Sequence, residues 1–228
     1  MTIARFKDLC VDVTCPSAMT AFWGRVIGLT SPADNPNVLV GDVPGKTIWI
    51  NKVDEPPTVK QRVHLDVQTG AIADLEREGA TVQTPETDEQ QWTVMADPEG
   101  GEFCGFVRET VPAYRLMELI VDSADPEAQV RWWASVVGGD VSSRPGRPYR
   151  WLENVPGLPF PYWVFVPVPE PKTVKNRIHW DVTAPALQPV LDAGATLLRP
   201  KDDDIGWHIC ADPEGNEFCV FLPAAEEA

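Results

Sequence analysis

One stretch of nine residues occurs twice in this chain, and this repeat constrains the fold more than any other feature. The sequence reads ADPEGGEFC at 96–104 and ADPEGNEFC at 211–219, so eight of the nine positions are identical. A match of this length predicts a tandem duplication, which divides the chain into a first domain at 1–110 and a second domain at 111–228. Each half is long enough to bury a modest hydrophobic core.

Each copy of the repeat begins as a turn and continues as a strand. Asp-Pro-Glu-Gly suits a type I turn, and the residues after it alternate between polar and apolar. Similar patterns along the first repeat indicate a strand, a helix and about three strands, and then the same order again. This order predicts an α+β fold of βαβββ modules. The predicted strands are 5–13, 47–51, 62–67, 80–82, 92–96 and 102–107, the predicted helices are 16–28 and 71–78, and the second repeat starts with a strand at 115–123.

The composition is that of an acidic globular protein. The net charge is −15, with 43% hydrophobic and 23% charged residues. Nucleic acids and membranes are therefore not expected as partners, because phosphate binding needs clustered Lys and Arg. The chain has no long apolar run and no signal-peptide pattern at its start. Its five cysteines are an odd number without a paired spacing, which favours a cytoplasmic protein.

Alternation along the predicted strands gathers polar side chains on one face of each repeat. At 5–13, for example, Leu9 and Val11 fall on one face, and Asp8 and Cys10 fall on the other. Helices must cover the apolar face, which leaves the polar face to line a cleft or to face solvent. The polar face collects Asp8, Cys10, Asp12, Trp49, Asn51, Arg62, His64, Asp66, Glu102, Cys104 and Phe106 in the first repeat, and Glu118, Asp122, Tyr162, Arg177, His179, Asp181, Glu217, Cys219 and Phe221 in the second.

Several motifs resemble those of the glyoxalase/bleomycin-resistance/extradiol-dioxygenase proteins, the vicinal oxygen chelate superfamily. They are the helix end FWGRVIGL at 22–29, the Arg-x-His-x-Asp strands at 62–66 and 177–181, and the repeated nine-residue stretch. The resemblance covers nearly the whole chain, twice. It implies an α+β fold with two tandem domains, each of two βαβββ modules that form a curved sheet around a cleft. It leaves the activity open, because the superfamily includes isomerases, dioxygenases, transferases and drug-binding proteins.

The resemblance also implies where a metal ion would be held, with one ligand from each of four strands in a domain. These ligand sets depart from the usual His and Glu residues of the family, since Asn is a poor ligand and Val is none. We therefore expect no cofactor, with a single divalent Zn, Fe, Mn or Ni ion as the alternative. The matching positions are Asp8, Asn51, His64 and Cys104 in the first domain and Glu118, Val166, His179 and Cys219 in the second, with Glu102 and Glu217 as substitutes for the cysteines.

Three functions are compatible with these residues. The favoured hypothesis is a metal-free protein that binds an aromatic or cationic metabolite or drug, as antibiotic-resistance members of the superfamily do. One alternative is a divalent-metal lyase, isomerase or dioxygenase. The other is metal-free acid–base catalysis by His64 with Asp66 or by His179 with Asp181, although both histidines could simply satisfy a row of buried polar groups. The predicted ligand-binding residues are Asp8, Trp49, Asn51, Arg62, His64, Glu102, Cys104, Glu118, Trp151, Tyr162, Arg177, His179, His208, Glu217 and Cys219.

The second repeat is a few residues longer than the first between its first helix and the strand of His179. The lengthened region, 142–162, is rich in Pro, Gly and Arg and contains Trp151, so it is either a lid over a cleft or a surface excursion. His208 stands where the first repeat has Thr93, and it is a further candidate for the second cleft. A duplicated chain can pair its own domains as single-domain relatives pair two subunits, which favours a monomer.

Overall fold

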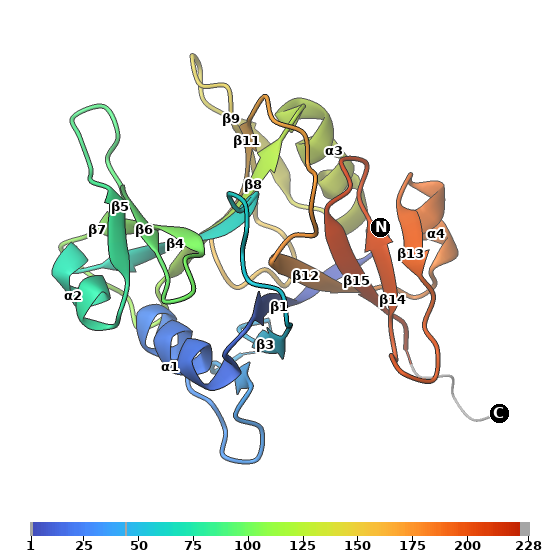
Figure 1. The fold of residues 1–228 in the computed structure, drawn as a ribbon. Coiled ribbons are helices and arrows are strands. Elements are labelled where there is room, and N and C mark those ends of the chain that lie inside the picture. The colour runs from blue at the N-terminus through green and yellow to red at the C-terminus, as the bar shows by residue number, and fades with distance from the viewer. Residues whose placement is uncertain (1, 44, 224–228) are drawn as a thin grey trace.

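The computed structural model describes residues 2–43 and 45–223, and the first repeat forms the elements that its sequence predicts (Figure 1). Helix α1 has Pro16 in its first turn and ends before Gly28, whose φ of 85° favours glycine. The elements of this repeat are β1 (Arg5–Val13), α1 (Pro16–Ile27), β2 (Val38–Leu39), β3 (Ile48–Lys52), β4 (Val63–Thr69), α2 (Ile72–Arg77), β5 (Thr81–Thr84), β6 (Thr93–Ala96) and β7 (Glu102–Val107).

The second repeat follows the same order, with three strands after its first helix where the first repeat has two. Its elements are β8 (Leu116–Ser123), α3 (Pro126–Val137), β9 (Asp140–Ser143), β10 (Arg150–Glu153), β11 (Tyr162–Pro167), β12 (Ile178–Thr183), α4 (Gln188–Asp192), β13 (Thr196–Arg199), β14 (His208–Ala211) and β15 (Glu217–Phe221). Most of the lengthened region at 142–162 belongs to the β9–β10 hairpin and the loop to β11, so it widens a sheet. The predicted α+β fold, with two tandem domains of βαβββ modules, is confirmed.

Each of the two sheets combines one module from each repeat. The seven-stranded sheet has the order β13-β14-β15-β12-β1-β3-β2, and the eight-stranded sheet has the order β5-β6-β7-β4-β8-β11-β10-β9. The first module therefore joins the fourth, because β1 pairs antiparallel with β12, and the second joins the third, because β4 pairs with β8. Figure 1 shows the dark blue β1 beside the brown β12, from the other end of the chain. Both sheets are therefore completed by strands of this one chain.

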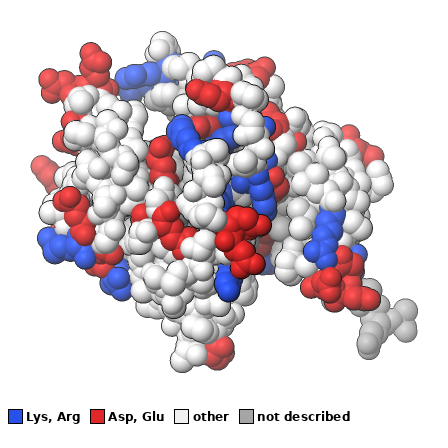
Figure 2. All heavy atoms as spheres, viewed as in Figure 1, with Lys and Arg blue, Asp and Glu red and all other residues white. Residues whose placement is uncertain are grey.

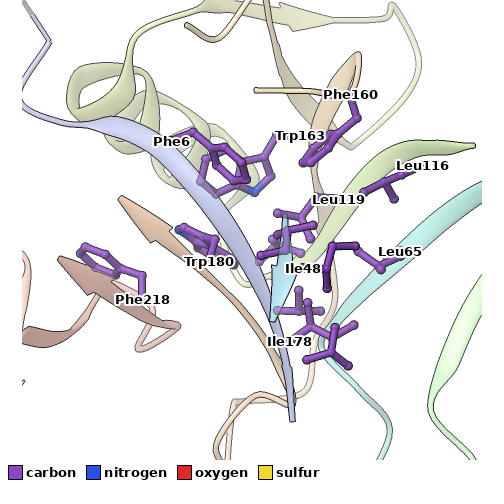
Figure 3. Packing of buried hydrophobic residues seen from close by; sticks show 14 of the residues in the cluster. Phe6, Ile48, Leu65, Leu116, Leu119, Phe160, Trp163, Ile178, Trp180 and Phe218 are labelled. Carbon is purple, nitrogen blue, oxygen red and sulfur yellow. The ribbon is translucent and has the colours of Figure 1, made fainter. Parts of the chain in front are cut away.

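The apolar faces of the two sheets pack together in the middle of the molecule, as Figure 3 shows. Trp163 of β11 and Trp180 of β12 meet there with ring centres 4.9 Å apart. Trp133 of α3 packs against both rings, and all three side chains are fully buried. Since the apolar faces turn toward this shared core, the polar faces of the two sheets point away from it.

The repeated Asp-Pro-Glu-Gly turns hold the N-termini of the two long helices. Asp97 accepts hydrogen bonds from two backbone N–H groups of its own turn, at 2.9 and 2.8 Å. The Glu99 carboxylate then accepts from the backbone N–H groups of Thr14 and Cys15, immediately before α1. Glu214 does the same before α3. An acidic group is favourable at this end of a helix, so the turn has the structural role that its sequence indicates.

Candidate functional site

The two sheets present two polar faces, and each face combines residues of both repeats. We call the polar side of the eight-stranded sheet the eight-strand face and that of the seven-stranded sheet the seven-strand face. On the eight-strand face, Asp66 of β4 lies opposite Glu118 of β8, and His64 lies opposite Ile120. A site on either face therefore needs both halves of the chain.

This pairing corrects the ligand sets, which were implied one domain at a time. The error has a simple cause, since β1 of the first repeat pairs with β12 of the second and not with its own β4. Strands that were assigned to one site thus lie on different sheets. The sets that share a face are Asp8, Asn51, His179 and Cys219 on the seven-strand face and Glu118, Val166, His64 and Cys104 on the eight-strand face.

Three side chains with metal-binding atoms meet on the eight-strand face. The Nε2 atom of His64 lies 3.7 Å from the Sγ of Cys104 and 3.5 Å from the Oδ1 of Asp66. Their exposed fractions are 8%, 4% and 4%, so the cluster is buried. Within the described chain, the Nδ1 of His64 and the Oδ1 of Asp66 have no hydrogen-bond partner. Buried polar atoms without partners are uncommon, so these two atoms are available to a ligand.

The eight-strand face carries acidic groups that the described chain does not neutralise. Burial raises the pKa of Glu118 to about 7, and burial together with the neighbouring Glu118 raises the pKa of Asp66. Burial lowers the pKa of His64 to about 3, so its imidazole is neutral at pH 7. Among the described residues, no Lys or Arg forms an ion pair with Asp66 or Glu118, and Lys60 pairs with Asp122 instead, at 2.9 Å.

Aromatic side chains stand at one end of the eight-strand face, and a pocket opens at the other. Trp92 stacks on Phe106 with ring centres 5.9 Å apart, and the guanidinium of Arg108 lies 5.2 Å from the centre of the Phe106 ring. The pocket has a volume of about 240 Å³ and is lined by Lys60, Asp122 and the loop before β12. The acidic cluster thus lies between an aromatic wall and a pocket.

Two predicted aromatic residues also face this cluster. Tyr162 of β11 lies beside Glu118 of β8, and both side chains are partly exposed. Trp151 of β10 pairs with Val164, which in turn lies beside Ile120, so the indole shares the same face. Its Nε1–H group is buried without a hydrogen-bond partner among the described residues. Tyr162 and Trp151 thus lie on the same face as the acidic cluster.

The seven-strand face holds a similar cluster with an additional thiol. Cys10 of β1 lies opposite His179 of β12, and its Sγ donates to the Oδ1 of Asp181 at 3.6 Å. Cys219 of β15 lies beside Asp181. Burial raises the pKa of Asp181 to about 6 and lowers the pKa of His179 to about 4.

Lysine side chains neutralise the acidic groups of the seven-strand face. The ammonium of Lys7 pairs with Asp8 and lies 4.4 Å from the centre of the Phe221 ring, which stacks on Trp207 at 5.3 Å. Trp49 donates to the same Asp8 carboxylate at 3.2 Å. Two further ion pairs complete the pattern, Lys175 with Asp12 and Lys172 with Glu217, the latter at 2.6 Å. Asn51 also donates to the Asp12 carboxylate, at 3.4 Å. Figure 2 shows acidic and basic side chains interleaved over the middle of the molecule.

Three predicted ligand-binding residues have other contacts in the structure. Arg62 donates to the backbone carbonyls of Glu170 and Asp122, at 2.6 and 2.9 Å. Arg177 donates to the backbone carbonyl of Glu55, and its guanidinium lies 3.6 Å from the carboxylate of Glu99. Both arginines therefore hold the connections between the sheets. His208 pairs with a fully buried valine on the apolar side of β15, and its Nδ1 accepts from a backbone N–H at 3.1 Å, so it does not reach the polar face.

Two residues of the seven-strand face were missed as site residues. Strict alternation places Lys7 on the same side as Leu9, but β1 is irregular between Phe6 and Asp8, and Lys7 reaches the polar face. Cys10 was assigned to the polar face and was not chosen, because the resemblance directs attention to Asp8. Its partner His179 lies in the other repeat, which no local pattern reveals.

Comparisons with known proteins agree with this architecture. The family described as glyoxalase-like domain matches the chain twice, at residues 8–106 and 118–221. Glyoxalase I from Zea mays has a similar fold, with a TM-score of 0.65 and 12% identity over 96% of this chain and 92% of that one. A putative dioxygenase from Bacillus subtilis is similar with a TM-score of 0.61 and 16% identity, over 98% of this chain and 86% of that one.

No curated protein matches the chain. The structural similarities are at low identity and show the fold alone, whereas the family match covers most of the sequence. The doubled match, the four modules that each begin with a strand and a helix, and the two sheets shared between repeats lead to one conclusion: this chain belongs to the glyoxalase-like domain family and carries the domain in tandem.

Proposed function

We propose that the eight-strand face binds a small organic cation that has an aromatic part. The observation that carries this proposal is a comparison of the two faces. On the seven-strand face, the ammonium of Lys7 pairs with Asp8 and lies over the Phe221 ring. The chain fills that acidic and aromatic position with a cation of its own, as a cation–π site prefers.

The eight-strand face has the matching position without the lysine. Glu118 stands where the other repeat has Asp8, and Met117 stands where it has Lys7. Lys7 lies at an irregularity in the pairing of β1 with β12, and Met117 lies at an irregularity in the pairing of β8 with β4. The two positions therefore have the same local geometry. Phe106 provides the aromatic ring, and the guanidinium of Arg108 already lies 5.2 Å from its centre. An external cation could therefore occupy the place beside Glu118 that Lys7 takes beside Asp8, next to the ring that Arg108 covers.

The surrounding residues indicate what such a ligand would look like. A positive charge would favour the ionised forms of Asp66 and Glu118, whose pKa values are raised in its absence. A flat group could stack on the wall formed by Trp92 and Phe106, and the free Nε1–H of Trp151 offers one hydrogen bond. Binding of this kind would sequester a compound, which supports a role in resistance to a cationic drug.

Fluorescence titration tests this proposal, because Trp92 and Trp151 would report binding. We expect arylalkylammonium compounds to change the emission saturably, and their uncharged alcohol analogues to have little effect. Met117→Lys should place an internal cation beside Glu118 and weaken binding by at least roughly tenfold. Lys7→Met is the matched control, because it should leave this binding intact. Equal binding of charged and uncharged compounds, or unchanged binding by the Met117→Lys protein, would contradict the proposal.

A metal-dependent enzyme is a second candidate, and the spacing of donor atoms on the eight-strand face favours it. Ordinary bond lengths in a tetrahedral zinc site place neighbouring ligand atoms about 3.3 to 3.6 Å apart. The corresponding distances from His64 are 3.5 Å to Asp66 and 3.7 Å to Cys104. These residues, with Glu118 beside them, would hold the ion, and it would supply Lewis acidity toward a substrate oxygen.

Metal analysis separates the two candidates. Protein purified without chelator and without a histidine tag should retain a divalent metal if the second candidate is right, and His64→Ala should lose it. Less than about 0.1 metal per chain, with no uptake on addition, would exclude a metal enzyme and leave organic-cation binding standing. Acid–base catalysis by His64 gains no support, because a pKa of about 3 makes its imidazole a weak base at neutral pH.

The proposal also covers the cellular location and the oligomeric state of the protein. No helix among the described residues is long and apolar enough to cross a membrane. All five cysteines are free thiols, four of them buried, which supports a reducing cytoplasm. We also propose that the chain acts as a monomer, because both sheets are completed within one chain. Light scattering coupled to size-exclusion chromatography would measure the mass.

A further inference from the structure

The seven-strand face has a thiol that the eight-strand face lacks. Cys10 lies opposite His179, whereas Ile120 takes the matching place opposite His64. Cys219 of β15 stands next to Asp181 of β12. Two thiols, an imidazole and a carboxyl group therefore project from three neighbouring strands. We call this set the Cys10 cluster, and it consists of Cys10, His179, Asp181 and Cys219.

The side chains of the Cys10 cluster are close together and buried. Donor atoms of Cys10, His179 and Asp181 all lie within 4.8 Å of one another. Both thiols interact with the Asp181 carboxyl group, and the Cys10 Sγ is 3.6 Å from its Oδ1. Exposed fractions range from 3% to 8% across the cluster, and the Nδ1 of His179 has no hydrogen-bond partner in the described chain.

We propose that the Cys10 cluster binds a zinc ion as a structural site. Two sulfur atoms, one nitrogen and one oxygen make a set suited to closed four-coordinate zinc, and soft thiolates favour zinc over hard cations such as magnesium. Each thiol would release its proton to solvent as its bond to the metal forms. Lys7 and Lys175 lie beside the cluster, each in an ion pair with a neighbouring carboxylate, Asp8 and Asp12 respectively.

This site shares His179 and Cys219 with the set that the family resemblance implies for the same sheet, and it differs from that set in its other two ligands. The implied ligand from β1 is Asp8, which is already engaged by Lys7 and Trp49. The proposed ligand is Cys10, one step further along the same side of the strand. A zinc ion here would connect β1 of the first repeat to β12 and β15 of the second, and so fasten the two repeats together. It does not depend on the proposed function, which concerns the opposite face.

Metal binding by cysteine variants tests this proposal. The background is Cys104→Ser, which removes the thiol of the eight-strand face. Metal-free protein in this background should take up about one Zn²⁺ per chain, and Zn²⁺ should raise its Tm. Co²⁺ in place of Zn²⁺ should give a near-ultraviolet sulfur-to-cobalt charge-transfer band. Adding Cys10→Ser or Cys219→Ser should weaken the band and lower affinity at least roughly tenfold, whereas Cys15→Ser, at an exposed thiol, should change neither.

Two outcomes would overturn the proposal. One is the absence of a charge-transfer band in the folded background protein. The other is uptake of Zn²⁺ by the Cys10→Ser and Cys219→Ser proteins that equals that of the background, because the thiols would then serve only as hydrogen-bond donors to Asp181. Far-UV circular dichroism of the metal-free variants confirms the fold, and if Cys10→Ser is unfolded, zinc uptake by folded Cys219→Ser decides.

Discussion

Asp66 in β4 lies directly opposite Glu118 in β8, so that two carboxyl groups from different repeats meet on one face without a neutralising Lys or Arg in ion-pair distance among the described residues. The matching pair on the other sheet is Asp181 and Asp8, and there Lys7 binds Asp8. The duplication has thus produced two sheets with similar geometry and different electrostatics. This difference is the basis for proposing that a ligand binds to the eight-strand face.

The raised pKa of Glu118 predicts a specific pH dependence of stability. Its ordinary value is 4.5 and its value in the fold is about 7, so the folded chain binds more protons than the unfolded chain between these values. The contribution of this group is therefore fully present below pH 4.5 and is lost as pH rises through 7. For each unit by which the pKa of a group differs between the folded and unfolded chains, the free energy of unfolding changes by about 1.4 kcal/mol across the titration.

Glu118→Gln removes this titration. We expect the variant to gain free energy of unfolding relative to the wild type as pH rises from 5 to 8, measured by urea denaturation at each pH. The low pKa values of His64 and His179 act in the opposite direction, but they are common to both proteins. The difference therefore reports the Glu118 carboxyl group together with its effect on the pKa of Asp66. A stability difference that stays constant across this range would contradict the prediction.

The glutamates of the two repeated turns, Glu99 and Glu214, should contribute more to the free energy of unfolding than other surface glutamates. Glu99→Gln and Glu214→Gln each replace a carboxylate that accepts two backbone N–H groups near a helix N-terminus. We expect each to lower the free energy of unfolding by about 1 to 2 kcal/mol. Glu76→Gln, at an exposed position in α2, is the control and should change it by less than about 0.5 kcal/mol. Equal effects at all three sites would show that the contacts do not stabilise the helices.

Two tryptophans of the shared core provide a matched test of a buried hydrogen bond. Trp133 donates to Asp212 at 3.1 Å, whereas the Nε1–H of Trp180 has no partner among the described residues. Both side chains are fully buried, so replacement by Phe removes a similar volume. Trp133→Phe should therefore be more destabilising than Trp180→Phe by about 1 kcal/mol in chemical denaturation. The reverse order would mean that packing outweighs the hydrogen bond.

The exchange of modules between sheets predicts how separated halves of the chain behave. Residues 1–112 lack β12 and β8, which are the central partners of β1 and β4. We expect this fragment alone to be unfolded or self-associated, and to form a folded one-to-one complex when co-expressed with residues 113–228. Size-exclusion chromatography with light scattering would detect the complex. A stably folded monomer of residues 1–112 would show that a repeat can complete its own sheet.

Local patterns were sufficient to predict most elements of the first repeat. The nine-residue repeat indicated the duplication, Pro16 and Gly28 marked the ends of α1, and alternation assigned His64 and Asp66 to a polar face. These features depend on neighbours in the sequence, because helix ends, turns and strand faces follow from backbone geometry over a few residues. The order of these elements indicated the βαβββ modules, the resemblance implied two tandem domains built from them, and the structure confirms this fold.

The partners of those residues were decided by the tertiary structure alone. Any of four similar modules could pair with any other, and the sequence of one strand does not state which copy lies beside it. Pairing of β1 with β12 brings Cys10 to His179, and pairing of β4 with β8 brings Asp66 to Glu118. The irregularity at Lys7 likewise arises only when β1 pairs with β12. The sequence therefore determined which groups line polar faces, and the pairing of modules from different repeats determined which groups share a site.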